Sequence, residues 1–152
     1  MAVVKQVEPT SKQYIVVKID NEQFGIDIKY IDNIVRLLSI TRVPMSQDYF
    51  KGVINLRGEI IPVMSLRKKL GLADDQFSPK TRIIISKVEN ATVGIIVDEV
   101  KEVITLEDDG LESVNYDNND DYKAYISAVG KEGNELISIL DIYGVIVEDE
   151  NQ

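Results

Sequence analysis

The side chain best placed for specific chemistry in this sequence is an arginine between two apolar runs. The stretch KGVINLRGEIIPVMSL, residues 51–66, sets Arg57 in a turn with no acid, thiol or imidazole poised to react. Its guanidinium offers five donors in a rigid fork that suits carboxylates or carbonyls, so the chemistry open to it is binding. Asn55, two residues earlier, either bonds the backbone of its own turn, which we favour, or contacts a partner.

Three interpretations of Arg57 follow from this setting. A solvated turn residue is the ordinary outcome for an arginine in a hairpin. Alternatively, the flanking Gly52 and Gly58 let backbone approach closely, and Arg57 anchors a partner. In the third interpretation, Arg57 braces the preceding helical segment by meeting Asp32 or Asn33. The sequence alone does not separate the last two.

The chain lacks most of the side chains that usually carry catalysis. The chain has no cysteine and no histidine, which removes thiolate nucleophiles, disulfides, structural zinc sites and the usual neutral-pH titrating group. Asp98 and Glu99 could serve a small hydrolase, but adjacent positions point apart and no partner acid or base is evident. We therefore predict no catalytic residue, no cofactor and no metal.

An acid-rich segment, residues 106–123, invites a calcium interpretation. Asp117, Asn119 and Asp121 occupy alternate positions as in an EF-hand. The sixth and twelfth loop positions, however, hold tyrosine and alanine where an EF-hand needs glycine and glutamate. We expect a solvated, mobile connector instead.

Composition narrows the function classes further. A 152-residue chain with 44% hydrophobic residues fits one domain, or two very small ones, around a packed core. With 26 acidic against 17 basic residues, the formal net charge of −9 repels phosphate backbones and anionic membranes. No apolar run approaches the roughly 20 residues that span a bilayer, and no signal peptide begins the chain. We expect a cytoplasmic protein without direct membrane insertion or a nucleic-acid partner.

Short apolar runs rich in isoleucine and valine, separated by turn signals, predict an all-β protein. The predicted strands are residues 14–19, 24–28, 50–56, 59–66, 82–88, 92–97, 124–130 and 135–142. Three further segments predict short helices or turns at strand ends: residues 29–38, with apolar side chains at helical spacing, and residues 65–72 and 141–147.

The sequence also aligns with itself. Residues 14–37 lie over residues 83–106, so that Gly25 meets Gly94. A second match places Gly58 on Gly133 and, after one extra residue, residues 60–66 over residues 136–142. We interpret this as a duplication with repeats of about 14–80 and 81–147. Because a repeat of this size buries only about 60% of its unfolded surface, the two repeats should pack against each other. We expect two small β-barrels joined by an apolar seam.

Four sequence blocks carry a family resemblance: GVINLRGEIIPVMSL, EQFGIDIKYIDNIV, VGIIVDEVKEV and LISILDI, at residues 52–66, 22–35, 93–103 and 136–142. Together they resemble the CheW-like family of chemotaxis adaptors over about residues 14–147. The resemblance implies one CheW-like domain over residues 1–152. Its fold would be two SH3-like or OB-like five-stranded β-barrels, with short helices, that exchange strands between the repeats.

The resemblance also implies a function, that of a non-catalytic scaffold. One surface would bind the regulatory domain of the histidine kinase CheA, and another the cytoplasmic tip of methyl-accepting chemotaxis receptors. The protein would thus associate with membrane receptor arrays through its partners. A binding module of another receptor–kinase pathway is one alternative. A nucleic-acid-binding barrel is another, but it needs a basic groove with stacking aromatics, and only 7% of the residues are aromatic.

Two apolar triplets that correspond under the repeat are further candidates for partner contact. They are Ile28, Ile31 and Ile34 in the first repeat, and Val97, Val100 and Val103 in the second. Apolar stripes are more often core than interface, and we expect at least half of the six to be core. The resemblance places the receptor groove between the two barrels, where a receptor helix needs aliphatic anchors. Ile31 and Val100 are the best candidates for exposure.

Overall fold

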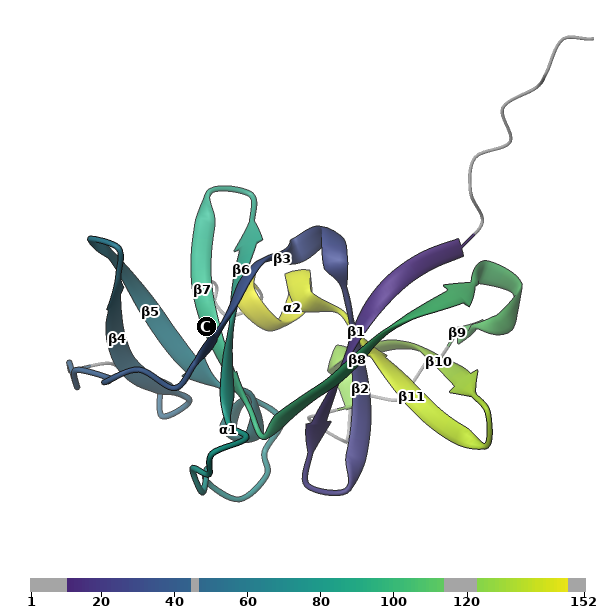
Figure 1. Cartoon of the computed structure of the whole chain (residues 1–152), viewed down its shortest axis with the longest axis horizontal. Helices are drawn as coiled ribbons and strands as arrows, with labels where there is room; N and C mark the ends of the chain where they lie inside the picture. Colours follow the sequence, from purple (N-terminus) through teal and green to yellow (C-terminus); the bar gives the residue numbers. More distant parts are fainter. Residues whose placement is uncertain (1–10, 45–46, 114–122, 148–152) are drawn as a thin grey trace, which may run out of the picture.

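The computed structural model describes residues 11–44, 47–113 and 123–147, and its strands form two sheets (Figure 1). The six-stranded sheet has the order β8-β1-β2-β11-β10-β9 and the five-stranded sheet the order β3-β6-β7-β5-β4. The first sheet is built from β8 (Glu99–Glu107), β1 (Ser11–Ile19), β2 (Glu22–Asp27), β11 (Glu135–Leu140), β10 (Ile126–Glu132) and β9 (Glu112–Ser113). The second is built from β3 (Ile31–Arg36), β6 (Arg82–Val88), β7 (Ala91–Val97), β5 (Glu59–Ser65) and β4 (Phe50–Leu56). The fold is therefore mainly β, as predicted.

Each sheet combines hairpins from both halves of the sequence. In the first sheet, β2 runs parallel to β11, with Phe24 beside Ser138, and β1 pairs with β8. In the second sheet, β5 runs parallel to β7, with Val63 beside Gly94, and β6 pairs with β3. The chain therefore passes from one sheet to the other between β2 and β3, and again between β7 and β8.

The hairpins β1–β2 and β6–β7 are buried on both faces, which explains their unbroken apolar runs. Along β1, Ile15 and Val17 point to one cluster while Tyr14 and Val16 point to another. Strand β6 alternates in the same way between two clusters. One cluster, which we call the seam cluster, draws on both sheets. Its members are Ile15, Val17, Ile19, Phe24, Ile26, Met64, Leu66, Leu70, Ile84, Val88, Val93, Ile95, Val97, Ile126, Leu140, Ile142 and Val145.

The helix predicted at residues 29–38 is wrong. A 3-10 turn, η1 (Ile28–Tyr30), is followed there by strand β3. Tertiary pairing overrides the local apolar spacing, because β3 pairs antiparallel with β6 and its isoleucines and valine suit a strand. Strand β8 was not predicted either. The first part of the expected connector at 106–123 instead contains the end of β8, η2 (Asp108–Gly110) and β9.

The other two predicted helices are present. Helix α1 (Leu66–Lys69) begins after Ser65, whose hydroxyl accepts the N–H of Lys68 at 3.1 Å. Helix α2 (Ile142–Val147) follows β11, and η3 (Lys123–Tyr125) precedes β10. Of the helices in the part of the chain described, none has the length and apolar character needed to cross a membrane.

Gly52 has a structural role in β4 that its prediction as a partner-contact residue did not include. It is buried in β4 with a φ of +142°, beside a bridge in which Thr41 and Val53 exchange hydrogen bonds of 2.8 and 2.9 Å. A Cβ at this position would lie 2.1 Å from the carbonyl oxygen of Thr41. Only glycine allows this close approach of two backbone segments.

We therefore expect Gly52→Ala to lower the free energy of unfolding by about 3 kcal/mol or more, through the clash and the strained φ. Gly133→Ala is the matched control, because its φ is +62° but no atom lies within 4 Å of the added Cβ. It should cost only about 1 kcal/mol. Urea unfolding of both variants measures the difference, and equal losses would show that the contact with Thr41 relaxes easily.

Candidate functional site

Arg57 lies at the exposed tip of the β4–β5 hairpin. Arg57 and Gly58 form a two-residue turn with φ values of 54° and 85°, a pattern typical of hairpins that follow the twist of the strands. The side-chain oxygen of Asn55 accepts the N–H of Gly58 at 3.0 Å. Asn55 therefore bonds its own turn, the interpretation favoured from the sequence, and this bond holds the turn that presents Arg57.

The bracing interpretation of Arg57 is wrong. Within the described ranges, no hydrogen bond or ion pair joins Arg57 to Asp32 or Asn33. The Asn33 side-chain oxygen instead accepts the N–H of Ile34 at 2.8 Å. The guanidinium is exposed and remains available to groups outside the chain.

The two apolar triplets do not form one continuous exposed stripe. Val97 is fully buried in the seam cluster, so it is core and unavailable to a partner in this structure. Ile28 is 37% exposed and Val103 is 54% exposed. The remaining three, Ile31, Ile34 and Val100, are partly buried and pack against the seam cluster from outside. The prediction that Ile31 and Val100 are the most exposed of the six is therefore wrong, because Ile28 and Val103 are more exposed. The structure thus leaves five of the six side chains at least partly accessible.

A charged cluster that was not predicted joins the two sheets at one end of the seam. Arg67 of α1 donates to Asp98 through Nε at 2.9 Å and through Nη2 at 2.7 Å, and also to Asp20. The backbone N–H of Asp20 donates to Asp98 at 2.9 Å. Asp20 lies in the β1–β2 turn of the first sheet, and Asp98 lies where the chain leaves β7 for β8. The cluster therefore holds the segment between β7 and β8, where the chain passes from one sheet to the other, in contact with both sheets.

The electrostatics of this cluster identify Asp98 as structural and not as a hydrolase carboxylate. Burial opposes ionisation of Asp98, but the hydrogen bonds from Arg67 and Asp20 outweigh it and lower its pKa. The pKa of Arg67 is raised, chiefly by the hydrogen bond to Asp98. A general base needs a carboxylate free to take a proton, and this one is engaged by a guanidinium.

The opposite end of the seam is closed differently. Under the repeat, Asp20 corresponds to Glu89 and Arg67 to Tyr143. The Tyr143 hydroxyl lies 3.2 Å from a carboxylate oxygen of Glu89, so a phenol–carboxylate contact stands where Arg67 contacts Asp20 at the other end. Tyr143 is 44% exposed, whereas the side chain of Arg67 is 13% exposed. Comparison of the repeats was the one sequence signal that could have paired these turns with these helices.

The calcium interpretation falls on Asp117, Asn119 and Asp121, which lie outside the described residues. In residues 11–44, 47–113 and 123–147, no group of three or more acidic side chains is placed to hold a metal ion.

Comparisons with known proteins agree on one family. Residues 13–150 match the description of a CheW-like domain. The chain is 34% identical to the chemotaxis protein CheW of Bacillus subtilis over 143 residues, 94% of this chain and 92% of that protein. It is 34% identical to that of Thermotoga maritima over 131 residues, 86% of this chain and 85% of that protein. The crystal structure of the scaffolding protein TtCheW from Thermoanaerobacter tengcongensis superposes with a TM-score of 0.81 at 32% identity, covering 88% of this chain and 91% of that one.

The Arg67 cluster predicts a pH-dependent stability difference between the wild type and Asp98→Asn. Because the folded state lowers the pKa of Asp98, its contribution is present above the ordinary value of 3.8 and is lost as the pH falls further. At pH 7 we expect Asp98→Asn to lower the free energy of unfolding by about 2 kcal/mol. This difference in the free energy of unfolding between the wild type and Asp98→Asn should become smaller as the pH falls below 3.8.

Chemical unfolding from pH 7 down to pH 3 measures this gap. Asp32→Asn, at an exposed carboxylate, is the control and should leave stability unchanged at neutral pH. A gap between wild type and Asp98→Asn that is constant over the whole range would mean that the Asp98 charge does not stabilise the crossing.

Proposed function

The chain belongs to the CheW-like family and is a chemotaxis adaptor, and we propose that it couples the regulatory domain of CheA to the cytoplasmic tip of methyl-accepting receptors. Coupling of this kind requires two separate contact surfaces and no chemical step. We assign the kinase contact to the β4–β5 hairpin that carries Arg57, and the receptor contact to the seam. A scaffold shifts its partners between states only through a difference in affinity for those states. The protein therefore acts through contact geometry rather than catalysis.

The receptor assignment rests on the difference between the two ends of the seam. In Figure 1 the lower end carries α1 and the β1–β2 turn, and the upper end carries α2, the start of β3 and the β6–β7 turn. At the lower end Val97 is buried, and the side chain of Arg67 is 13% exposed. At the corresponding upper-end positions Ile28 is 37% exposed and Tyr143 is 44% exposed. The upper end thus offers apolar surface that its counterpart covers.

An amphipathic receptor helix fits the upper end because such helices insert aliphatic anchors into apolar grooves. Ile31, the first residue of β3, lies beside Ile28 and packs against the seam cluster from outside. Val100, its counterpart, lies near the start of β8, which begins toward the lower end in Figure 1. We therefore treat the two as separate test positions and expect Ile31 to contribute more.

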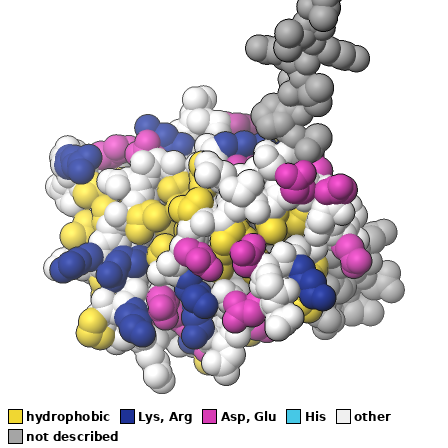
Figure 2. All heavy atoms as spheres, turned by 45° about the vertical axis from the view of Figure 1, so that its right-hand side comes forward, with side chains coloured by type: hydrophobic (Ala, Val, Ile, Leu, Met, Phe, Trp, Pro, Cys, Tyr) yellow, Lys and Arg dark blue, Asp and Glu magenta, His cyan; other side chains and the backbone are white. Residues whose placement is uncertain are grey.

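Charges on the surface favour protein partners over polyanions. Figure 2 shows apolar side chains exposed between acidic and basic ones on the same face. A mixed rim around an apolar centre is typical of protein interfaces, and it makes binding only moderately sensitive to salt.

Ile31→Asp is the test of the receptor surface. The substitution removes about 1 to 2 kcal/mol of apolar burial and adds the desolvation of a charge, so binding of a soluble receptor-tip fragment should be nearly abolished. Binding of the CheA regulatory domain should persist, as measured by isothermal titration calorimetry with each partner. Val100→Asp, the matched substitution at the other end, should weaken receptor binding less.

Two outcomes would contradict the receptor assignment. A collapse of the thermal melt of Ile31→Asp would place this side chain in the core, and stronger loss of receptor binding in Val100→Asp would place the contact at the lower end. Loss of kinase binding with receptor binding retained would reverse the assignment of surfaces.

Arg57→Ala tests the kinase surface. Because the side chain is exposed at a turn, the thermal melt should be unchanged, while CheA binding should weaken by about 1 to 3 kcal/mol. Arg36 is also exposed but lies on β3, so Arg36→Ala controls for the loss of one positive charge. Wild-type affinity of Arg57→Ala for CheA in calorimetry would remove Arg57 from the kinase contact.

A further inference from the structure

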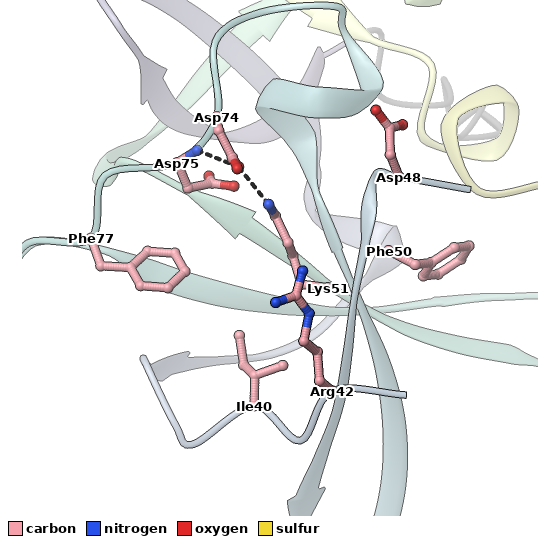
Figure 3. A pocket seen from close by; sticks show the side chains of 8 residues that line it. All are labelled: Ile40, Arg42, Asp48, Phe50, Lys51, Asp74, Asp75 and Phe77. Carbon is pink, nitrogen blue, oxygen red and sulfur yellow. Dashed lines mark hydrogen bonds and ion pairs between the residues drawn. The ribbon is translucent and has the colours of Figure 1, made fainter. Parts of the chain in front are cut away.

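A cavity of about 370 Å³ lies at the start of β4, at the opposite end of that strand from the Arg57 turn. It opens between the segment that follows β3, which supplies Ile40 and Arg42, and the loop between α1 and β6, which supplies Asp74, Asp75 and Phe77. Figure 3 shows these side chains facing a common space with Lys51 of β4. The cavity therefore combines apolar walls with charges of both signs.

Most of the charges around this cavity are already neutralised within the chain. Lys51 donates to Asp74 at 2.5 Å, Lys68 pairs with Asp48 at 3.4 Å, and Arg67 is held by the seam-end cluster. Arg42 and Asp75 are the exceptions. Both carboxylate oxygens of Asp75 are buried, and neither has a hydrogen-bond partner among the described residues.

The isolated chain bears a cost for Asp75 in this position, because a buried carboxylate without a partner is destabilising. Burial raises its pKa, while the hydrogen-bonding influence of the nearby Ser65 hydroxyl and the charge of Lys51 oppose that rise more weakly. Buried groups left unpaired in a cavity are candidates for ligand contact.

We propose that this cavity receives an arginine side chain from a partner protein, with Asp75 as its counter-charge. A guanidinium supplies a fork of donors that matches both oxygens of a carboxylate. The aliphatic stem would pack on Ile40, and the guanidinium plane can stack on Phe77, which is 51% exposed. The site lies at the start of β4, whereas Arg57 lies in the turn that follows the other end of that strand, and it includes neither Ile28 nor Ile31.

Arg42 of the same chain is the competing occupant. It lines the same cavity and is exposed, and within the described residues it has no hydrogen bond or ion pair. Were Arg42 to fill the site in solution, an external arginine would bind only after Arg42 is removed. That difference separates the two occupants experimentally.

The test is a titration of the ¹⁵N-labelled full chain with Nα-acetyl-arginine amide, followed by amide chemical shifts. We expect saturable shifts at Ile40, Lys51 and Phe77, with a dissociation constant on the order of 1 mM for a ligand of this size. The neutral isostere Nα-acetyl-citrulline amide should bind at least about tenfold more weakly, because it lacks the charge that pairs with Asp75.

Asp75→Asn should weaken binding of the arginine probe at least about tenfold. The melting temperature should stay equal or rise, because the substitution removes a buried charge. Phe77→Ala should also weaken binding, and Asp109→Asn, at an exposed carboxylate of η2, should not. Absence of saturable shifts, equal binding of citrulline, unchanged binding in Asp75→Asn, or binding seen only in Arg42→Ala would each overturn the proposal. Since the assay uses this chain alone, such a failure leaves the adaptor function untouched.

Discussion

The burial of two hairpins on both faces is the constraint on which the rest of the structure depends. Strands β1 and β6 each send alternate side chains to a cluster within their own sheet and to the seam cluster. Neither sheet could cover its seam face alone, and uncovered apolar surface of that extent is unfavourable in water. The two sheets are therefore held together by the same strands that form their separate cores. Because the seam cluster is already packed, a partner at the seam can contact only the side chains at its surface.

Internal similarity of sequence produces similar backbones but different ends of the seam. The turns at Asp20 and Glu89 both begin with a positive φ, and both side chains reach toward a short helix that follows a corresponding strand. The guanidinium of Arg67 donates a hydrogen bond to Asp20, and the phenol of Tyr143 donates one to Glu89. The guanidinium of Arg67 also binds Asp98 through two nitrogens, and such a bidentate ion pair is stronger than a hydrogen bond from a phenol. Substitution at two matched positions thus leaves one end closed and the other accessible.

Local sequence patterns predicted the strands that are buried on both faces, because such strands need continuous apolar runs whatever their neighbours. They failed at β3, where isoleucines at helical spacing pair with β6 instead. The Arg67 cluster could not be predicted from local pattern, since Asp20, Arg67 and Asp98 come together only through the crossing of the chain between sheets. The burial of Val97 and the accessibility of Ile28 likewise follow from what packs over each end.

Backbone geometry sets Arg57 apart from the other residues with a positive φ. In the described ranges, three residues other than glycine have a positive φ: Asp20, Arg57 and Glu89. Such a conformation costs about 1 to 2 kcal/mol for a residue with a Cβ. Asp20 and Glu89 offset that cost with contacts across the seam, to Arg67 and Tyr143. The φ of Arg57 is instead that of a two-residue hairpin turn held by the bond from Gly58 to Asn55, so its exposed side chain is left free for a contact outside the described chain.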